Sequence, residues 1–130
     1  DLIVPVFAAP GDTPEEREPL VRRARQQIAF YGSTPNYAFQ FDDLGFDGTT
    51  AHLGALIRAG DLEAMEAAIT DEMLEHFAIV CPWDELAERL VDRYGGTASR
   101  VVMYLAEESI RRDPDSIERW GEVARTVRST

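Results

Sequence analysis

Three short apolar runs, each followed by the pattern of an amphipathic helix, constrain the fold of this chain more than any other feature. The runs cover residues 2–8, 77–81 and 100–105, and apart from Arg100 their side chains are apolar without alternation. Unbroken apolar runs of this length are typical of strands that are buried on both faces. Strands that alternate with helices pair in parallel through right-handed crossovers. The sequence therefore predicts a helix-rich α/β fold with three parallel strands.

The helices that follow these runs have recognisable ends. Residues 13–16 read Thr-Pro-Glu-Glu, a capping box with proline at the first helical position, which satisfies two backbone amides. Pro19 then predicts a kink or a separate first turn. Gly95 is typical of a helix end, and Asp113 of a helix start. The main helices are expected near 14–31, 84–94 and 114–128.

The region between the first helix and residue 77 contains no second strand pattern. Gly60 closes one short amphipathic helix, and Asp61 and Thr70 are placed to cap two more. The chain, residues 1–130, is therefore interpreted as one segment with a helical insertion at about 37–76.

Three parallel strands leave open edges and one poorly covered sheet face. Isolated proteins avoid open edges, because unpaired strand edges recruit other chains. A (β/α)8 TIM barrel of eight strand–helix units has about 250 residues or more, and its last three units plus an insertion would account for this chain. The sequence also starts at Asp1 inside an apolar run. We expect the C-terminal part of a longer protein, whose partner is the missing N-terminal part of the barrel or a second copy of itself, giving a homo-oligomer.

Composition excludes several functions. The net charge is −11 and the thirteen cations are all arginine, so nucleic acid and anionic membrane surfaces are not expected partners. Without lysine, the chain has neither a Schiff-base lysine nor a Walker lysine. No apolar run is long enough to span a membrane. Cys81 is the only cysteine, which indicates a reducing, cytoplasmic compartment.

Several motifs occur together in an order that resembles a known family. The most specific is residues 28–37, which read Ile-Ala-Phe-Tyr-Gly-Ser-Thr-Pro-Asn-Tyr. The others are VPVF at 4–7, DEML at 71–74, FAIV at 77–80, DELAERL at 84–90 and YGG at 94–96. Over nearly its whole length the chain resembles the C-terminal portion of the luciferase-like monooxygenase superfamily, particularly its deazaflavin-dependent oxidoreductase branch.

The resemblance implies an oxidoreductase with a barrel fold and an active site at the C-terminal strand ends. Such an enzyme binds FMN or a deazaflavin coenzyme and performs hydride or oxygen chemistry. The family's glycine-rich cofactor loop is absent here, so the catalytic residues are unknown, no cofactor is expected on this chain alone, and the isolated segment is expected to be inactive. Residues 81–85 read Cys-Pro-Trp-Asp-Glu instead of the family's Gly-Thr-Pro-Glu-Glu, which weakens any role of that loop in holding a phosphate. The alternative function is a non-enzymatic acidic α/β interaction module.

Candidate site residues lie after the strands and in one turn. In a barrel, chemistry is located just after the strands, here at 8–12, 81–83 and 104–108. Tyr31, Ser33, Thr34 and Tyr37 could bind a polar substrate beside Pro35. The alternative is an ordinary turn with capping hydroxyls and a half-buried tyrosine.

Other chemistry-bearing residues have simpler explanations. Cys81 is interpreted as a small buried residue, because no histidine is close in sequence. Glu72 and His76 could share one helix face, but two ligands do not make a metal site. The stretch that begins at Asp43 resembles a calcium loop but has Gly54 where a bidentate glutamate is required. No metal site is predicted.

Overall fold

The computed structural model describes residues 1–130, which form two compact units. The sheet unit comprises Asp1–Val21 and Ala78–Thr130, and the helical unit comprises Arg22–Phe77. Helix α1 (Pro14–Gly32) begins in the first unit and ends in the second.

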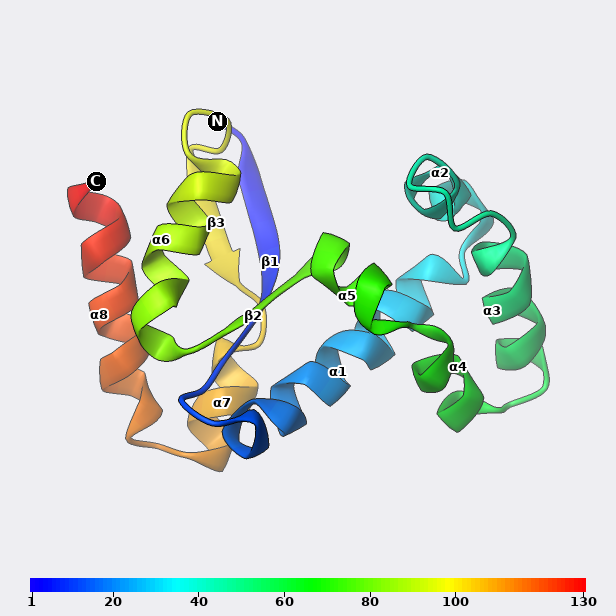
Figure 1. Cartoon of the computed structure of the whole chain (residues 1–130), viewed down its shortest axis with the longest axis horizontal. Helices are drawn as coiled ribbons and strands as arrows, with labels where there is room; N and C mark the ends of the chain where they lie inside the picture. The colour runs from blue at the N-terminus through cyan, green and yellow to red at the C-terminus, as the bar shows by residue number, and fades with distance from the viewer. The chain divides into compact units, whose positions relative to one another are not determined.

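The sheet unit contains three parallel strands, as predicted. Strand β1 (Ile3–Pro10) pairs with β2 (Ala78–Cys81) and with β3 (Arg100–Met103), so the sheet order is β2-β1-β3 (Figure 1). The first register pairs are Phe7 with Ala78 and Ile3 with Arg100. Strand β2 therefore pairs with the C-terminal half of β1, and β3 pairs with its N-terminal half.

The hydrogen bonds place β2 and β3 on opposite edges of β1. The carbonyl of Val6 accepts from the N–H of Tyr104 at 3.0 Å, whereas the N–H of Gly11 donates to the carbonyl of Cys81 at 3.1 Å. Alternate residues of a strand point their backbone groups to opposite edges, so Pro5 faces the β2 edge. Pairing with β2 begins only at Phe7. The missing N–H of Pro5 therefore removes no sheet hydrogen bond, which agrees with the expected unpaired side.

The strand order differs from the order in a barrel. Successive strands of a (β/α)8 barrel are neighbours, so β3 would lie beside β2. Here β3 lies on the other edge of β1. No other strand of the described chain pairs with that edge of β1, so β3 can occupy it.

Two helices cover one face of the sheet. Helices α6 (Trp83–Tyr94) and α8 (Ser116–Ser129) pack against each other, and α6 also packs on β1 and β2 (Figure 1). Their apolar side chains and the even-numbered residues of β1 form one core. Its buried members are Val6, Ala8, Ile79, Cys81, Leu86, Leu90, Trp120 and Val123.

The opposite face of the sheet carries exposed apolar side chains. Ile3 and Val102 are 49% and 50% exposed, and Tyr104 is 44% exposed. The ring of Phe7 packs edge-on against Tyr104 with 5.2 Å between ring centroids. We call the face formed by Ile3, Phe7, Val102 and Tyr104 the open face. Parallel sheets are normally covered on both sides, so the open face matches the predicted poorly covered surface.

The helical unit contains no strand, as predicted. After α1 it comprises η1 (Pro35–Tyr37), α2 (Ala38–Asp42), α3 (Thr49–Arg58), α4 (Leu62–Ala68) and α5 (Asp71–Phe77). Two predicted caps are confirmed. The Asp61 carboxylate accepts from the N–H of Ala64 at 3.0 Å, and the Thr70 hydroxyl accepts from the N–H of Met73 at 3.2 Å. Gly60 has a φ of +71° directly before the first of these caps, a conformation that favours glycine.

Polar side chains connect α1 to the later helices of this unit. The Arg25 guanidinium donates to the carbonyl of Ile69 and pairs with Asp71. The Glu66 carboxylate accepts from Arg22 and Gln26. These bonds hold α4 and the start of α5 to the C-terminal part of α1.

Several predicted boundaries are wrong in detail. Helix α7 (Ala106–Arg112) was not predicted, and β3 ends at Met103 rather than at residue 105. Phe77 belongs to α5 rather than to β2. Helix α1 continues through Pro19, its sixth residue, so the separate first turn that was one of the two expectations is not formed.

Two helix starts also differ in detail from the predicted ones. The Thr13 hydroxyl accepts from the N–H of Glu16 at 3.2 Å, as in a capping box. The Glu16 carboxylate, however, accepts from the N–H of Asp12 at 2.9 Å instead of that of Thr13. The last helix begins at Ser116 because Asp113 forms a turn first, accepting from the N–H of Asp115 at 3.3 Å.

Candidate functional site at the ends of β1 and β2

The loop after β1 is held closely against the start of α1. The Arg17 guanidinium donates to the carbonyl of Gly11 at 2.6 Å. A Cβ atom at Gly11 would lie 2.9 Å from the backbone nitrogen of Arg17, so only glycine fits there. The close packing of Gly11 against Arg17 places Asp12 directly at the carboxyl end of the sheet.

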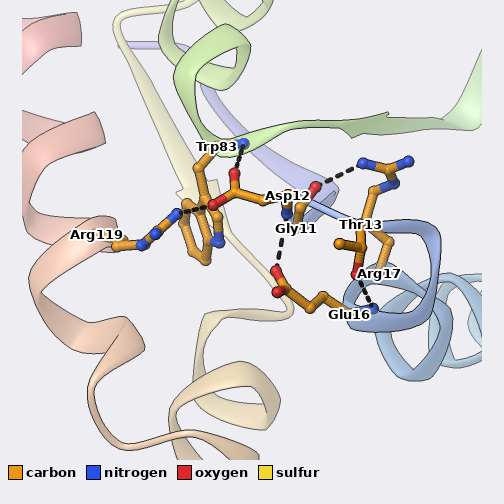
Figure 2. Close-up of polar contacts among 7 residues, drawn as sticks. All are labelled: Gly11, Asp12, Thr13, Glu16, Arg17, Trp83 and Arg119. Carbon is orange, nitrogen blue, oxygen red and sulfur yellow. Dashed lines mark hydrogen bonds and ion pairs between the residues drawn. The ribbon is translucent and has the colours of Figure 1, made fainter.

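Asp12 joins three elements through its carboxylate. One oxygen accepts from the N–H of Trp83, the first residue of α6, at 3.4 Å, and the other pairs with the guanidinium of Arg119 in α8 at 2.7 Å (Figure 2). We call Asp12, Trp83 and Arg119 the strand-end cluster. The carboxylate thus satisfies an amide at the α6 N-terminus and fixes the position of an arginine.

Two tryptophans form the apolar side of this cluster. The Arg119 guanidinium lies 5.7 Å from the centroid of the Trp83 ring, and Trp83 meets Trp120 edge-on at 5.0 Å. The indole N–H of Trp120 donates to the buried hydroxyl of Ser109, which also bonds Ser116. The exposed ion pair therefore lies against the half-buried Trp83, which in turn packs on the buried, hydrogen-bonded Trp120.

The ion pair keeps both of its members charged. The hydrogen bond from Arg119 lowers the pKa of Asp12 below its ordinary value, although partial burial opposes this shift. The same bond raises the pKa of Arg119. Asp12 therefore acts as an anion at neutral pH and is unsuited to act as a general acid there.

A cavity of about 410 Å³ opens beside the strand-end cluster. Its polar lining consists of Asp12, Asp84, Glu122, Arg119 and Thr126, with Trp83, Ala87 and Val123 as the apolar part. Three carboxylates face one arginine that is already paired. The cavity is therefore suited to a neutral or cationic group rather than to an anion.

A flavin phosphate does not fit this end of the sheet. Pro82, which precedes the first residue of α6, has no N–H, and the N–H of Trp83 is already bonded to Asp12. Asp84 and Glu85 add negative charge to the first turn of α6. A phosphate at this N-terminus would meet like charges instead of free amides.

The predicted substrate residues lie together in a turn of the helical unit. Tyr31 and Tyr37 are 43% and 42% exposed. The Ser33 hydroxyl donates to the carbonyl of Phe30 at 2.7 Å, and the N–H of Tyr37 donates to the carbonyl of Thr34 at 2.9 Å. Ser33 therefore caps the end of α1, as the simpler interpretation expected. Substrate contact by the four residues stays a prediction.

Two other sequence interpretations can be compared with the structure. Cys81 is 2% exposed and burial raises the pKa of its thiol, which confirms a small buried residue. Glu72 and His76 are exposed, and the His76 ring lies edge-on to Phe46. The structure contains no group of three or more side chains that could hold a metal ion.

Sequence reasoning missed Arg119 as a member of the strand-end cluster. Asp12 and Trp83 were both included because they follow predicted strands. Arg119 is 107 positions from Asp12, and no local motif marks it. Gly11, directly before Asp12, was the available sequence signal that the backbone packs closely at this point.

Comparisons with known proteins now add to this geometry. The family model described as luciferase-like monooxygenase matches residues 1–100. The uncharacterized protein Rv1360 of Mycobacterium tuberculosis and the uncharacterized protein Mb1395 of Mycobacterium bovis are each 39% identical over 97 residues. The matched region covers 75% of this chain but 28% of each relative. No solved structure matches the chain significantly.

One further finding concerns membranes. None of the helices has the length and apolar character that crossing a bilayer requires.

The family match spans the first two strands, the helical unit and α6, which together make up most of the chain. The chain therefore belongs to the luciferase-like monooxygenase family.

Proposed function

We propose that this chain forms the C-terminal part of a (β/α)8 barrel oxidoreductase that uses FMN or a deazaflavin for hydride or oxygen chemistry. The observation that carries the proposal is the open face within a chain that matches the family over residues 1–100. A longer enzyme would supply the missing strands, and the chain spans less than a third of the relatives that it matches.

The two faces of the sheet support this assignment. In a barrel, helices cover the outer face of each strand, and side chains of the inner face fill the interior. Here α6 and α8 cover one face, and the open face carries Ile3, Phe7, Val102 and Tyr104. Apolar side chains of that size are suited to a barrel interior.

The proposal assigns the cofactor phosphate to residues upstream of this chain. The α6 N-terminus is unsuitable because its first turn is acidic and its first amide is bonded to Asp12. This chain would instead contribute side chains to the substrate region, and the hydroxyls of Tyr31 and Tyr37 are our candidates for hydrogen bonds to a polar substrate. The isolated chain would then be inactive. A cytoplasmic location is part of the same proposal.

A second candidate function is an acidic interaction module. The outer edges of β2 and β3 have no strand partner, and the chain carries a net charge of −11. Unpaired edges are common sites for strand addition by another protein. In that case the chain would act without a cofactor and without the missing strands.

The coding sequence upstream of Asp1 separates the two functions. An uninterrupted reading frame that encodes five further strand–helix units supports the enzyme. A stop codon followed by a start codon immediately before Asp1 supports the interaction module and overturns the proposal.

Steady-state kinetics on the longer protein test the assigned hydroxyls. Tyr31→Phe or Tyr37→Phe should lower kcat/KM about tenfold for one lost hydrogen bond of about 1.4 kcal/mol. Tyr94→Phe, at the C-terminal end of α6 and outside the strand-end cluster, is the control and should leave the kinetics of the folded protein unchanged. If both tyrosine variants keep wild-type kinetics, residues 31–37 form a turn that has a structural role only.

A further inference from the structure

The outer edge of β3 is an unpaired strand edge of the sheet unit. In the sheet order β2-β1-β3, the strand has β1 as its one neighbour. The N–H groups of Arg100 and Tyr104 donate to carbonyls of β1 and its flanking residue. Because alternate residues of a strand point their backbone groups to opposite edges, Val101 and Met103 direct theirs to the outer edge. The N–H and carbonyl groups of these two residues are therefore available to an added chain.

An apolar cavity of about 610 Å³ lies between this strand and α8. We call it the edge groove, and its lining consists of Leu90, Ser99, Arg100, Val101, Met103, Trp120, Val123, Ala124, Val127 and Arg128. A second cavity of about 530 Å³ shares Arg100, Val101 and Val127 with it and so continues it past the start of β3. Two adjoining cavities beside one free strand edge suit an extended chain.

The edge groove differs in charge from the cavity beside the strand-end cluster. That cavity is lined by three carboxylates, whereas the only charged residues of the edge groove are Arg100 and Arg128. The Arg128 guanidinium has no ion-pair partner, and Arg100 pairs with Asp1 at 3.3 Å, where both side chains are more than half exposed. Such an exposed pair contributes little, so another carboxylate can compete with Asp1. In a chain of net charge −11, the edge groove therefore favours an anionic partner.

We propose that the edge groove binds an extended acidic peptide segment of another protein, which adds as a strand to the outer edge of β3. Backbone hydrogen bonds to Val101 and Met103 supply affinity, and alternate apolar side chains of the peptide enter the groove beside Ala124 and Val127. Carboxylates of the peptide pair with Arg128 and Arg100. The inference deepens the second candidate function, on which it rests, by naming the edge that binds and the chemistry of the partner.

The family assignment does not supply this site. The match to the family model ends at residue 100, and most of the edge groove is built from residues 101–128 of β3 and α8. The groove also lies on the helix-covered side of the sheet, where Val101 and Met103 pack against the core. It is therefore separate from the open face.

A fluorescein-labelled, capped peptide in which glutamate alternates with valine is the probe, and its anisotropy is followed as this chain is added. Saturable binding is expected. A peptide with lysine in place of glutamate should bind at least about tenfold more weakly, because it meets arginines instead of pairing with them. Two further peptides carry N-methyl groups on alternate residues, one on each set, so that one of them lacks every N–H that would face β3. That peptide should also bind at least about tenfold more weakly.

Variants of this chain locate the binding site. Arg128→Glu should weaken binding at least about tenfold, because it replaces attraction with repulsion. Arg125→Glu is the matched control: it makes the same charge change in α8 at an exposed residue that does not line the edge groove, and it should keep most of the affinity. Ala124→Trp should block the peptide by filling the groove. Circular dichroism checks that each variant is folded.

Amide hydrogen exchange tests the added strand directly. The bound peptide should slow exchange at Val101 and Met103, whereas Val102, whose N–H faces β1, should change little. Absence of peptide binding overturns the inference, as do equal affinities for the glutamate and lysine peptides or for Arg128→Glu and Arg125→Glu. Binding of decanoate but not of the peptide would assign the groove to a fatty acid. A dimer that Arg128→Glu dissociates, again without peptide binding, would assign it to a second copy. Both results overturn the inference.

The reading frame upstream of Asp1 tests the second candidate function separately. A chain that starts at Asp1 and does not bind the peptide would overturn this inference and leave the module assignment intact. Peptide binding by a longer protein that carries five further strand–helix units would support the docking edge and contradict the module assignment.

Discussion

The sheet unit and the helical unit are stabilised in different ways. In the sheet unit, the polar contacts that position the strand-end cluster join residues far apart in sequence, such as Asp12 and Arg119. In the helical unit, two helix starts are capped from within three residues, by Asp61 and Thr70. The sheet unit also presents the open face, a row of apolar side chains along paired strands. The comparison indicates that two helix starts of the helical unit are capped locally, whereas the strand-end cluster of the sheet unit depends on residues far apart in sequence.

The largest expected effect is in the sheet core. Trp120 is 7% exposed, packs on Trp83 and bonds the hydroxyl of Ser109. Trp120→Ala should lower the free energy of unfolding by about 3–5 kcal/mol, because it leaves a cavity and removes the hydrogen bond to the buried hydroxyl of Ser109. Trp120→Phe, which keeps a ring but loses the N–H, should cost less. Denaturant titration measures both, and equal small losses would show that the core does not depend on this side chain.

The second prediction concerns packing in the helical unit. A Cβ at Gly32 would lie 2.6 Å from Cε2 of Phe41 and 3.1 Å from Cδ1 of Leu53. Gly32→Ala should therefore destabilise by about 1–3 kcal/mol through overpacking. Gly54→Ala is the matched control, since its nearest neighbour is the flexible end of Arg58 at 3.3 Å. That substitution in the interior of α3 should stabilise by up to about 1 kcal/mol. Effects of the same sign would contradict the predicted difference in packing.

A smaller effect is expected at a helix cap of the helical unit. Asp61→Ala removes the acceptor for the N–H of Ala64 and should cost about 1 kcal/mol. Asp61→Asn should recover most of that loss, because the amide oxygen still accepts the bond. Thermal unfolding of the three proteins measures the difference. Equal melting temperatures for wild type and Asp61→Ala would show that α4 needs no side-chain cap.

The smallest effect is a pH dependence at the strand-end cluster. Because Arg119 lowers the pKa of Asp12 in the folded protein, the carboxylate stabilises the fold above its ordinary pKa. That contribution disappears as the pH falls through the lowered pKa. Asp12→Asn should therefore melt below wild type at neutral pH and match it in acid. Asp92→Asn, an exposed control in α6, should melt like wild type at neutral pH. A constant difference between Asp12→Asn and wild type at all pH values would assign the effect to something other than ionisation.

The sequence was sufficient to predict features that depend on neighbouring residues. Apolar runs and caps gave the three parallel strands and most of the helices. Helix α7 was missed because the apolar residues up to Leu105 were interpreted as strand, although Glu107 and Glu108 each pair with an arginine four residues later. That spacing is a helical signal.

The remaining features depend on contacts that no local pattern records. Arg119 joins Asp12 only because α8 folds back beside the end of β1. The strand order was not predictable either, because the partner of an edge depends on which other strands are present. The position of β3 beside β1 is such a case.

We infer that the open face is available to associate with another chain, and the mass of this chain in solution shows whether it does. Size-exclusion chromatography with light scattering should give a mass above 14.6 kDa that rises with concentration. Val102→Glu, which places a charge on the open face, should reduce that association, whereas Leu62→Glu on the exposed surface of the helical unit should not. A sharp monomer at 14.6 kDa at every concentration, with cooperative thermal unfolding, would contradict the claim.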